Sequence, residues 1–280
     1  MFFNGVMQLI DTDALIRLAR DAGDEIMKIY NEDRIAVETK ADDSPLTNAD
    51  MASHQTLVAG LRAMTPEIPI LSEESAALPW EQRRQWRRYW LIDPLDGTKE
   101  FVKRTHEFTV NIALIEDGYP VIGVVHAPAI DTLYYGVEGR GAFRARGEGK
   151  AEPIRVAADP HRPMRIVGSK SHATESLRRF VACVDDAELV SMGSSLKFCL
   201  VAEGAADIYP RLGPTSEWDT AAAQAVVEQA GGRVTTLDLQ RFRYNTKDSL
   251  LNPEFLVFSE VQAAWKSCLE DARTDAEARP

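Results

Sequence analysis

The stretch WLIDPLDGTKEF (residues 90–101) joins an apolar run to a tight, acidic bend. The run predicts a buried strand, and Pro94 and Gly97 favour a bend directly after it. Asp93 and Asp96 lie three residues apart across this bend, so their carboxylates can converge on one point. Carboxylates this close repel each other, and Mg²⁺ prefers such oxygens together with substrate phosphates. The stretch therefore predicts a magnesium-dependent phosphoryl site, with an acidic surface turn as the alternative.

Length and composition set the class of protein. A chain of 280 residues can form one large domain or two packed lobes with a real core. Hydrophobic residues make up 45% of it and charged residues 27%, which is ordinary for a globular protein. The formal net charge of −11 argues against a nucleic-acid polymer as partner. It does not argue against a small anion, because a bound cation inverts the local field.

Cysteine usage and hydropathy predict the compartment. Cys183, Cys199 and Cys268 are scattered and include no Cys-x-x-Cys pair, so neither a zinc knuckle nor a disulfide framework is suggested. This pattern fits a reducing compartment. The first residues lack a signal-peptide pattern, and no run approaches the roughly 18–20 apolar residues that span a bilayer. The sequence predicts a cytoplasmic, soluble protein without a transmembrane segment.

The first half predicts two helices followed by an antiparallel sheet. Apolar residues at helical spacing predict the first helix at about 9–30. The second follows Thr47, whose spacing to Asp50 is that of a capping box, which gives Asp50 a structural role as the alternative to a catalytic one. Short strands are predicted at 36–39 and 68–71, and two hairpins from runs at 108–115 and 121–126 and at 132–137 and 142–145.

Two further segments of this half carry charge. Glu73 and Glu74 follow the predicted strand at 68–71 after Ser72, so a second acidic pair closes an apolar strand and predicts ligands from neighbouring strands. Residues 80–88 interleave four arginines with tryptophans. That composition is typical of a solvated helix whose aromatic face packs inward. A site for a nucleic-acid strand or an anionic membrane surface is the alternative.

Residues 146–163 are rich in glycine, proline and charge and predict the lobe boundary, giving lobes of 1–150 and 151–280. The second lobe alternates strands with helices, which indicates a layered α/β arrangement. Its predicted strands are 164–168, 188–191, 206–209 and 255–258, and its predicted helices are 174–183, 195–203, 220–230 and about 261–271. Asp219 precedes one helix as a candidate N-cap or metal ligand. Arg211, Lys197 and His172 are candidate phosphate contacts, with surface charge as the alternative.

Three motifs together resemble the metal-binding signatures of the inositol monophosphatase-like phosphatases across nearly the whole chain. They are Glu73-Glu74, the run DPLDGT at 93–98, and WDTAA at 218–222 with GG at 231–232. Residues 71–74, 93–101, 193–204, 209–211 and 213–215 resemble more closely the bacterial 3'(2'),5'-bisphosphate nucleotidases of the CysQ type. The resemblance implies an α-β-α-β-α sandwich of two lobes, with the metal site in the cleft between them.

The resemblance also implies roles for particular residues. Two or three Mg²⁺ ions would be held by Glu73, Asp93, Asp96, Asp219 and the Leu95 carbonyl. Asp50 with Thr98 would orient the attacking water. Relatives that take adenosine bisphosphates use residues matching Ser194, Lys197 and Arg211, and His172 is a looser match. The full set of implied substrate contacts is Glu73, Asp96, Gly97, Thr98, Lys99, His172, Ser194, Lys197, Arg211 and Asp219.

The implied activity is removal of the 3'-phosphate of adenosine 3',5'-bisphosphate, giving AMP and phosphate. By the same resemblance the enzyme would also act on the sulfated form, serve sulfate assimilation and be inhibited by lithium. An inositol or other sugar-phosphate phosphatase on the same scaffold is the alternative enzyme. A non-catalytic phosphate-sensing regulator is the alternative of another class, but it predicts lost ligands, whereas all four carboxylates and Thr98 are present. Peripheral association with the cytoplasmic side of the inner membrane through residues 80–88 is a weaker hypothesis, and the sequence does not predict an oligomeric state.

Overall fold

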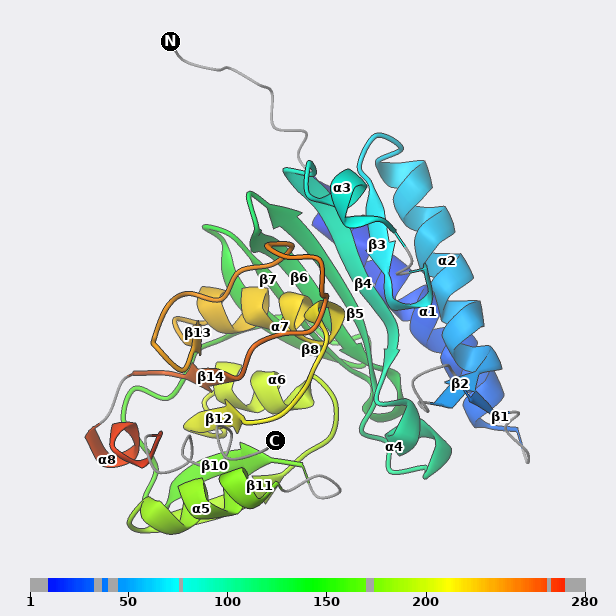
Figure 1. Ribbon diagram of the computed structural model, residues 1–280. Coiled ribbons are helices and arrows are strands. Elements are labelled where there is room, and N and C mark those ends of the chain that lie inside the picture. Colours follow the sequence, from blue (N-terminus) through cyan, green and yellow to red (C-terminus); the bar gives the residue numbers. More distant parts are fainter. Residues whose placement is uncertain are drawn as a thin grey trace.

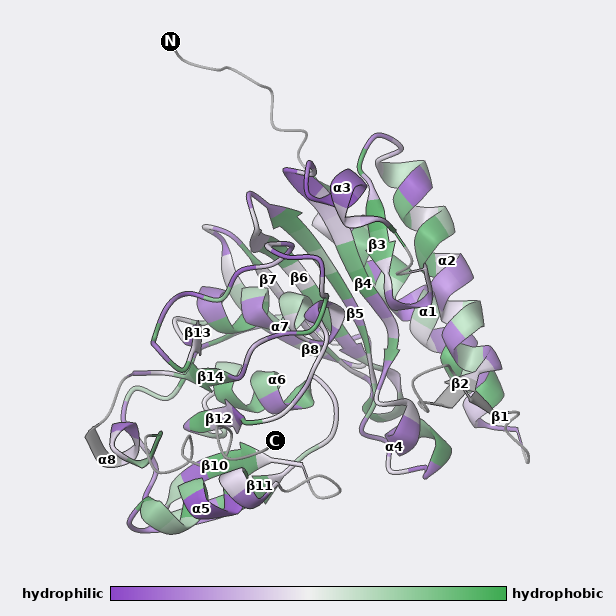
Figure 2. Cartoon of the chain, in the orientation of Figure 1, coloured by the Kyte–Doolittle hydropathy of each residue, from purple (hydrophilic) through white to green (hydrophobic). Residues whose placement is uncertain are grey.

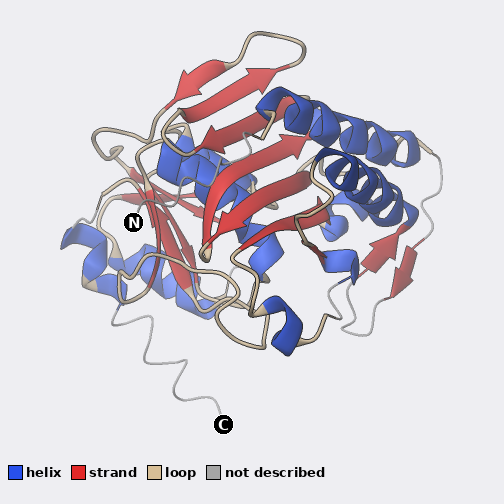
Figure 3. Ribbon diagram, turned by 90° about the horizontal axis from the view of Figure 1, so that it is seen from above, coloured by secondary structure: helices blue, strands red, loops and turns tan. Residues whose placement is uncertain are grey.

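The chain forms five layers in the order helices, sheet, helices, sheet, helices (Figure 1). The computed structural model describes residues 10–32, 37–39, 45–75, 78–169, 174–260 and 263–269. Seen from above, two sheets are separated by helices that lie between them (Figure 3). This is the α-β-α-β-α sandwich that the resemblance implies. No helix in the described ranges is both long enough and apolar enough to cross a membrane.

The first sheet has seven strands in sequence order, and only its first pair is parallel. Both predicted hairpins are confirmed. The strands are β3 (Ile70–Ser72), β4 (Arg88–Asp96), β5 (Thr109–Glu116), β6 (Tyr119–Ala127), β7 (Thr132–Val137), β8 (Gly141–Arg146) and β9 (Glu152–Ile154). Because β9 pairs with β8, residues 152–154 belong to this sheet although they follow the predicted lobe boundary.

Helices α1 (Thr12–Tyr30) and α2 (Asn48–Met64) cover the outer face of this sheet, as the sequence predicts (Figure 1). The predicted capping box is present at the start of α2. Shorter elements connect the larger ones: β1 (Val37–Thr39) with β2 (Pro45–Thr47), the 3-10 turns η1 (Glu73–Ser75) and η2 (Pro128–Ile130), and the short helices α3 (Trp80–Arg83) and α4 (Thr98–Val102).

Strand β4 is buried on both faces, which explains its continuous apolar run. Tyr89 and Leu91 pack into the cluster shared with the inner helices, whereas Trp90 and Ile92 pack into the cluster shared with α1 and α2. Figure 2 shows the apolar strands of this sheet in green beside a more polar α3. Since side chains alternate along a strand, Asp93 continues the face of Tyr89 and Leu91. The alternation therefore turns Asp93 toward the inner helices.

The second sheet has the strand order β11-β10-β12-β14-β13. Its strands are β10 (Met164–Gly168), β11 (Ala187–Ser191), β12 (Ile208–Arg211), β13 (Arg233–Thr236) and β14 (Phe255–Phe258). The sequence missed β13. Helices α6 (Leu196–Ala202) and α7 (Glu217–Gln229) lie between the two sheets, and α5 (Glu175–Cys183) and α8 (Ala263–Lys266) pack with the apolar cluster on the outer side.

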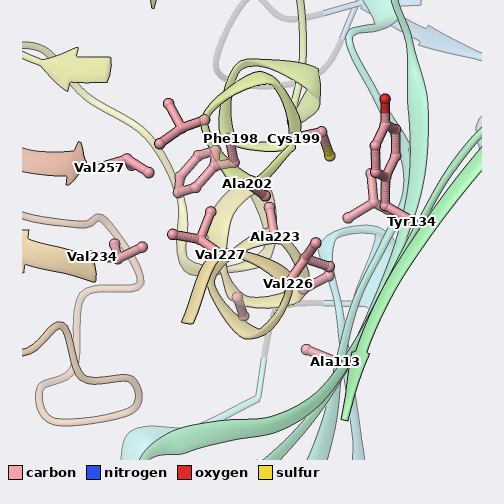
Figure 4. Close-up of a cluster of buried hydrophobic side chains, with 14 of the residues drawn as sticks. Ala113, Tyr134, Phe198, Cys199, Ala202, Ala223, Val226, Val227, Val234 and Val257 are labelled. Atoms are coloured by element: carbon pink, nitrogen blue, oxygen red, sulfur yellow. The ribbon is translucent and has the colours of Figure 1, made fainter. Parts of the chain in front are cut away.

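Helix α7 is nearly all buried because it packs between the two sheets. Figure 4 shows Ala223, Val226 and Val227 of this helix between Ala113 of the first sheet and Val234 of the second. On the first sheet the contact is backbone to backbone. A Cβ on Gly123 would lie 2.0 Å from the Ala222 carbonyl oxygen, and one on Gly136 would lie 2.7 Å from that of Ala225. The two glycines thus allow α7 to lie directly on β6 and β7.

Three expectations from the sequence are wrong. Asp219 is not the N-cap of α7, because the helix begins at Glu217 and Ser216 caps it. Cys183 and Cys268, 85 residues apart, form a disulfide with an S–S distance of 2.08 Å, whereas the scattered cysteines suggested none. The fold brings them together because α5 and the chain after α8 share one apolar cluster.

In the arginine-rich segment 80–88, one arginine is buried although the sequence predicts a solvated helix. Arg83 is only 1% exposed, and its guanidinium donates to Asn245 Oδ1 at 2.8 Å and to the Lys247 carbonyl at 3.1 Å. It also lies 4.8 Å from the centroid of the Trp80 ring. This arginine therefore joins α3 to a loop of the second half instead of facing solvent. Arg84 and Arg87 are exposed, as expected.

Candidate active site

The acids at the end of β4 meet a third acid from α7. One carboxylate oxygen from each of Asp93, Asp96 and Asp219 lies within 4.8 Å of the others. An irregularity in the pairing of β4 with β5 lies between Asp93 and Asp96 and brings both side chains to this point. Asp219 reaches it from the first turn of α7. Glu73, in η1 at the end of the neighbouring strand β3, lies close enough to raise the pKa of Asp93.

This crowding perturbs the acids strongly. Burial raises the pKa of Asp93 well above its usual range, and the charges of Glu73, Asp96 and Asp219 raise it further. Burial, followed by the charge of Asp96, raises the pKa of Asp219 to about 8. Asp93 Oδ1 accepts the Leu95 N–H at 3.0 Å. Its Oδ2 is buried and has no hydrogen-bond partner within the described part of the chain.

An orphaned carboxylate oxygen among other carboxylates fits a hard divalent cation. A buried acceptor without a donor costs about 1–3 kcal/mol, and a bound cation removes that cost together with the mutual repulsion. Carboxylate and carbonyl oxygens are the ligands that Mg²⁺ takes. The donor set therefore fits magnesium, with Glu73, Asp93, Asp96 and Asp219 as the residues that would hold it.

Asp50 lies beside this cluster, and its two oxygens do different things. Oδ2 accepts the Thr47 N–H at 2.8 Å and the Thr47 hydroxyl at 2.6 Å, which is the capping box of α2. Oδ1 accepts the Thr98 hydroxyl at 3.3 Å, and the same hydroxyl lies 3.3 Å from the Leu95 carbonyl oxygen. The capping role of Asp50 and a role at the site thus coexist.

Gly97 makes the turn that places Thr98. Its φ of 92° lies in the left-handed region, where glycine is favoured. A Cβ at this position would also lie 3.0 Å from the Glu107 carbonyl oxygen and 3.3 Å from Ser194 Cβ. A residue with a side chain would therefore be strained here, and the bend between β4 and α4 requires glycine.

The carboxylates share a cavity with two cations. This cavity, of about 120 Å³, is lined by Asp96 and Asp219 together with Lys197 and Arg211. Burial lowers the pKa of Lys197 to about 8, against the attraction of Asp96. Its Nζ lies 5.6 Å from the centroid of the Tyr209 ring. A strongly perturbed lysine beside perturbed carboxylates is typical of a functional cleft.

Arg211 is held by its own loop. Its Nε donates to the Gly213 carbonyl at 3.3 Å and its Nη2 to the Pro214 carbonyl at 2.5 Å. These contacts fix the plane of the guanidinium at the edge of the cavity. Arg211 also lines a neighbouring cavity of about 330 Å³, together with Lys99.

The structure brings most of the predicted site residues together. Gly97 and Ser194 line the same cavity as Lys197 and Arg211, and Ser194, two residues before α6, has a φ of 44°. Lys99 is exposed and lies on the neighbouring cavity. His172 lies outside the described residues. Thr98 joins Asp50 and the Leu95 carbonyl through its hydroxyl, and Glu73 lies near Asp93.

Sequence reasoning missed Ser195 and Asn111. Ser195 donates to Asp96 Oδ2 from its N–H at 2.6 Å and from its hydroxyl at 2.8 Å. Asn111 Nδ2 donates to Ser195 Oγ at 2.9 Å. A signal existed for Asn111, because it is a polar residue inside an otherwise apolar strand. Ser195 stands beside Ser194 in the sequence, and spacing alone does not distinguish them.

Fold and site together define a metal-dependent phosphatase, with an acidic cluster between two layered sheets. The chain belongs to the inositol monophosphatase family, whose sequence profile matches residues 10–269. It is 48% identical to the 3'(2'),5'-bisphosphate nucleotidases CysQ of Salmonella typhimurium and Escherichia coli K12, over 88% of this chain and 98% of each relative. The crystal structure of CysQ from Bacteroides thetaiotaomicron matches with a TM-score of 0.79 at 40% identity, covering 91% of this chain and all of that one.

Proposed function

We propose that the protein is a 3'(2'),5'-bisphosphate nucleotidase that hydrolyses the 3'-phosphate of adenosine 3',5'-bisphosphate to give AMP and phosphate. It would also act on the sulfated form of this nucleotide, in sulfate assimilation. The observation that carries the proposal is the shared cavity, where Asp96 and Asp219 lie near Lys197 and Arg211. Such a site offers carboxylates that can hold a metal ion for one phosphate and cations that can bind a second phosphate. The 48% identity to the CysQ nucleotidases supports the same substrate class.

The reaction centre would lie at the carboxylates. Two or three Mg²⁺ ions held there would make a bound water more acidic and neutralise charge on the phosphoryl oxygens. Asp50 would accept the proton of the attacking water through Thr98, since the Thr98 hydroxyl already donates to Asp50 Oδ1. The Thr47 contacts hold the other oxygen of Asp50, so its carboxylate keeps the orientation that this transfer needs.

The second phosphate would lie at Lys197 and Arg211. Charge-assisted hydrogen bonds from Lys197 and Arg211 are the strong contacts for a phosphate dianion. Because loop carbonyls already fix the Arg211 guanidinium, little conformational freedom is lost when a phosphate binds. Ser194 would add a hydroxyl contact, and Lys99 would act from the neighbouring cavity. A contact from His172 remains part of the proposal.

The proposed reaction takes place in the cytoplasm on a small molecule. A nucleic-acid polymer is not among its partners. Membrane association through residues 80–88 has less support in the structure than in the sequence, because Arg83 is turned inward and Arg88 pairs with Glu116 at 2.9 Å. We therefore do not include a membrane partner in the proposal.

Phosphate release from a substrate panel tests the function. With Mg²⁺, adenosine 3',5'-bisphosphate and its sulfated form should have higher kcat/KM than inositol 1-phosphate, and Li⁺ should inhibit. Lys197→Met should raise KM for the bisphosphate roughly 10–100-fold, the value of a charged hydrogen bond. It should change KM for inositol 1-phosphate much less, which makes that substrate the internal control.

Two outcomes would contradict the proposal. Preference for inositol 1-phosphate, with no selective effect of Lys197→Met, would indicate a sugar-phosphate phosphatase. A protein that binds Mg²⁺ but releases phosphate from no substrate would indicate a phosphate-sensing regulator.

A further inference from the structure

One oxygen of Asp96 is restrained by donors from the protein. Asp96 Oδ2 accepts the Ser195 N–H at 2.6 Å and the Ser195 hydroxyl at 2.8 Å. Thr109 Oγ1 and Asn111 Nδ2 lie farther from it, at 3.4 and 3.5 Å. These contacts restrain Oδ2, so the carboxylate cannot rotate freely, and Oδ1 is the oxygen left for the acidic cluster.

The Ser195 hydroxyl is itself oriented by a third residue. Its oxygen accepts the Asn111 amide at 2.9 Å, and it lies 2.8 Å from Asp96 Oδ2 and 2.6 Å from the Asp219 carbonyl oxygen. A hydroxyl has one proton, so it donates to one of these two acceptors at a time, and the carboxylate is the stronger. Because the Asn111 amide donates to the hydroxyl oxygen, the hydroxyl proton must point away from Asn111, toward these acceptors.

These groups are shielded from water and joined to both halves of the site. Ser195 and Asn111 are each 1% exposed, so solvent does not compete for their hydrogen bonds. Asn111 lies opposite Asp93 in the register of β4 and β5. Ser195 precedes α6 and contacts both Asp96 at the end of β4 and the backbone of Asp219 in α7. Ser195 thus contacts two segments that carry predicted metal ligands, the end of β4 and the first turn of α7.

We propose that Ser195, oriented by Asn111, is a positioning residue for the metal site: it fixes Asp96 and holds the end of β4 against the first turn of α7. This inference rests on the proposed role of Asp96 as a metal ligand. Residues that hydrogen-bond a metal ligand typically contribute 10–100-fold to metal affinity or activity. The alternative is a purely structural role at the start of α6, which predicts lost stability with unchanged metal affinity.

The proposal is tested by titrating the metal-free protein with Mn²⁺ in the absence of substrate and measuring the bound ion by electron paramagnetic resonance. Ser195→Ala should raise the Kd about 10–100-fold, and Asn111→Ala should raise it less. Thr65→Val is the matched control, because it removes a buried hydroxyl that accepts the Trp90 indole N–H at 2.8 Å at the far end of α2. The control should lose melting temperature and keep the wild-type Kd.

Activity gives a second readout. If Ser195 acts through metal affinity, raising Mg²⁺ should restore much of the kcat that Ser195→Ala loses. A variant that binds Mn²⁺ within twofold of wild type would overturn the proposal, as would a Kd change of the same size in Thr65→Val. If Ser195→Ala does not fold, Asn111→Ala decides by the same twofold criterion.

The test separates this inference from the proposed function. Metal binding is measured without any nucleotide, so it does not depend on the identity of the substrate. If the wild-type protein fails to hydrolyse adenosine 3',5'-bisphosphate while Ser195→Ala still weakens Mn²⁺ binding, the substrate proposal fails and the positioning role stands. If hydrolysis is as proposed and Mn²⁺ binding is unchanged, only the positioning role fails.

Discussion

Helices α2 and α7 begin with the same local structure at two sides of the site. At the start of α2 the Thr47 N–H donates to Asp50 Oδ2, and at the start of α7 the Ser216 N–H donates to Asp219 Oδ2, both at 2.8 Å. Each aspartate is the third residue of its helix, and each helix N-terminus favours its negative charge. One oxygen of each carboxylate is therefore fixed by the sequence around it.

The second oxygens differ because their surroundings differ. Asp50 Oδ1 accepts the hydroxyl of Thr98. Asp219 instead lies among other acids, and burial and the charge of Asp96 raise its pKa to about 8. The same capping box thus presents one carboxylate to a hydroxyl, where it can accept a proton, and the other to a cation site. The local motif fixes the position of the group, and the fold decides its chemistry.

Replacing Asp50 or Asp219 by asparagine should have the largest effect on activity and should distinguish the roles of the two carboxylates. Asn keeps an oxygen for the cap, so both helices should still begin at the same residues. Asp219→Asn should weaken Mn²⁺ binding by more than the roughly 10–100-fold typical of residues that only support a ligand, and turnover should be lost. Asp50→Asn should lower kcat about 10²–10⁴-fold, the usual contribution of a general base, and leave Mn²⁺ affinity unchanged.

Mn²⁺ titration and steady-state kinetics on both variants check this pair, with melting temperatures to show that each folds. If Asp50→Asn weakened metal binding as much as Asp219→Asn, both carboxylates would be ligands. The two aspartates would then have the same role, although their helices differ in surroundings.

The pH dependence of substrate binding sharpens the comparison, because Asp219 at the start of α7 shares its cavity with Lys197 and Arg211. Burial lowers the pKa of Lys197 to about 8. Above that pH the lysine loses its charge, whereas a phosphate, with a second pKa near about 6, stays dianionic. KM for adenosine 3',5'-bisphosphate should therefore be flat while the lysine is charged and rise by up to about tenfold per pH unit once it loses its charge. A cation bound among the carboxylates would cancel their attraction for Lys197, so the rise would begin at or below pH 8.

Steady-state kinetics between pH 6.5 and about 9.5 measure this rise, and Lys197→Arg is the control, since arginine keeps its charge throughout that range. The variant should show a flat KM. A rise that persisted in Lys197→Arg would assign the titration to another group.

Local motifs account for what the sequence predicted. The capping box at Thr47 and Asp50, the acidic bend at 93–98 and the two hairpins each depend on residues a few positions apart, so spacing is enough to find them. The Ser195 contact with Asp96 spans 99 residues, and the disulfide spans 85. The first contact exists only after the segment before α6 has packed against the end of β4, and the second only after α5 and the chain after α8 share one apolar cluster. No spacing rule contains either contact.

The start of α7 shows how packing decides between local alternatives. Ser216 and Asp219 are both good N-cap residues, so propensity alone does not choose between them. The close approach of Ala222 to Gly123 fixes where the helix lies on β6. With the helix in that place Ser216 becomes the cap, and Asp219 turns into the cluster. Arg83 shows the same effect. The composition of residues 80–88 suggests a surface charge, but a loop of the second half buries this arginine.

Removing the cap side chains should have the smallest effect and should still separate the two helices. The Thr47 hydroxyl accepts the Ala49 N–H at 3.2 Å and donates to Asp50 Oδ2 at 2.6 Å. Ser216→Ala should cost about 1 kcal/mol of unfolding free energy, as for an ordinary cap, and Thr47→Ala about 1–2 kcal/mol, because it also loses a bond to a carboxylate. Urea denaturation of the metal-free protein measures both, and Thr47→Ser, which keeps the hydroxyl, should lie near wild type. Equal losses would mean that the Thr47 hydroxyl adds nothing beyond the cap. Asp50 would then be held by a backbone N–H alone, as Asp219 is.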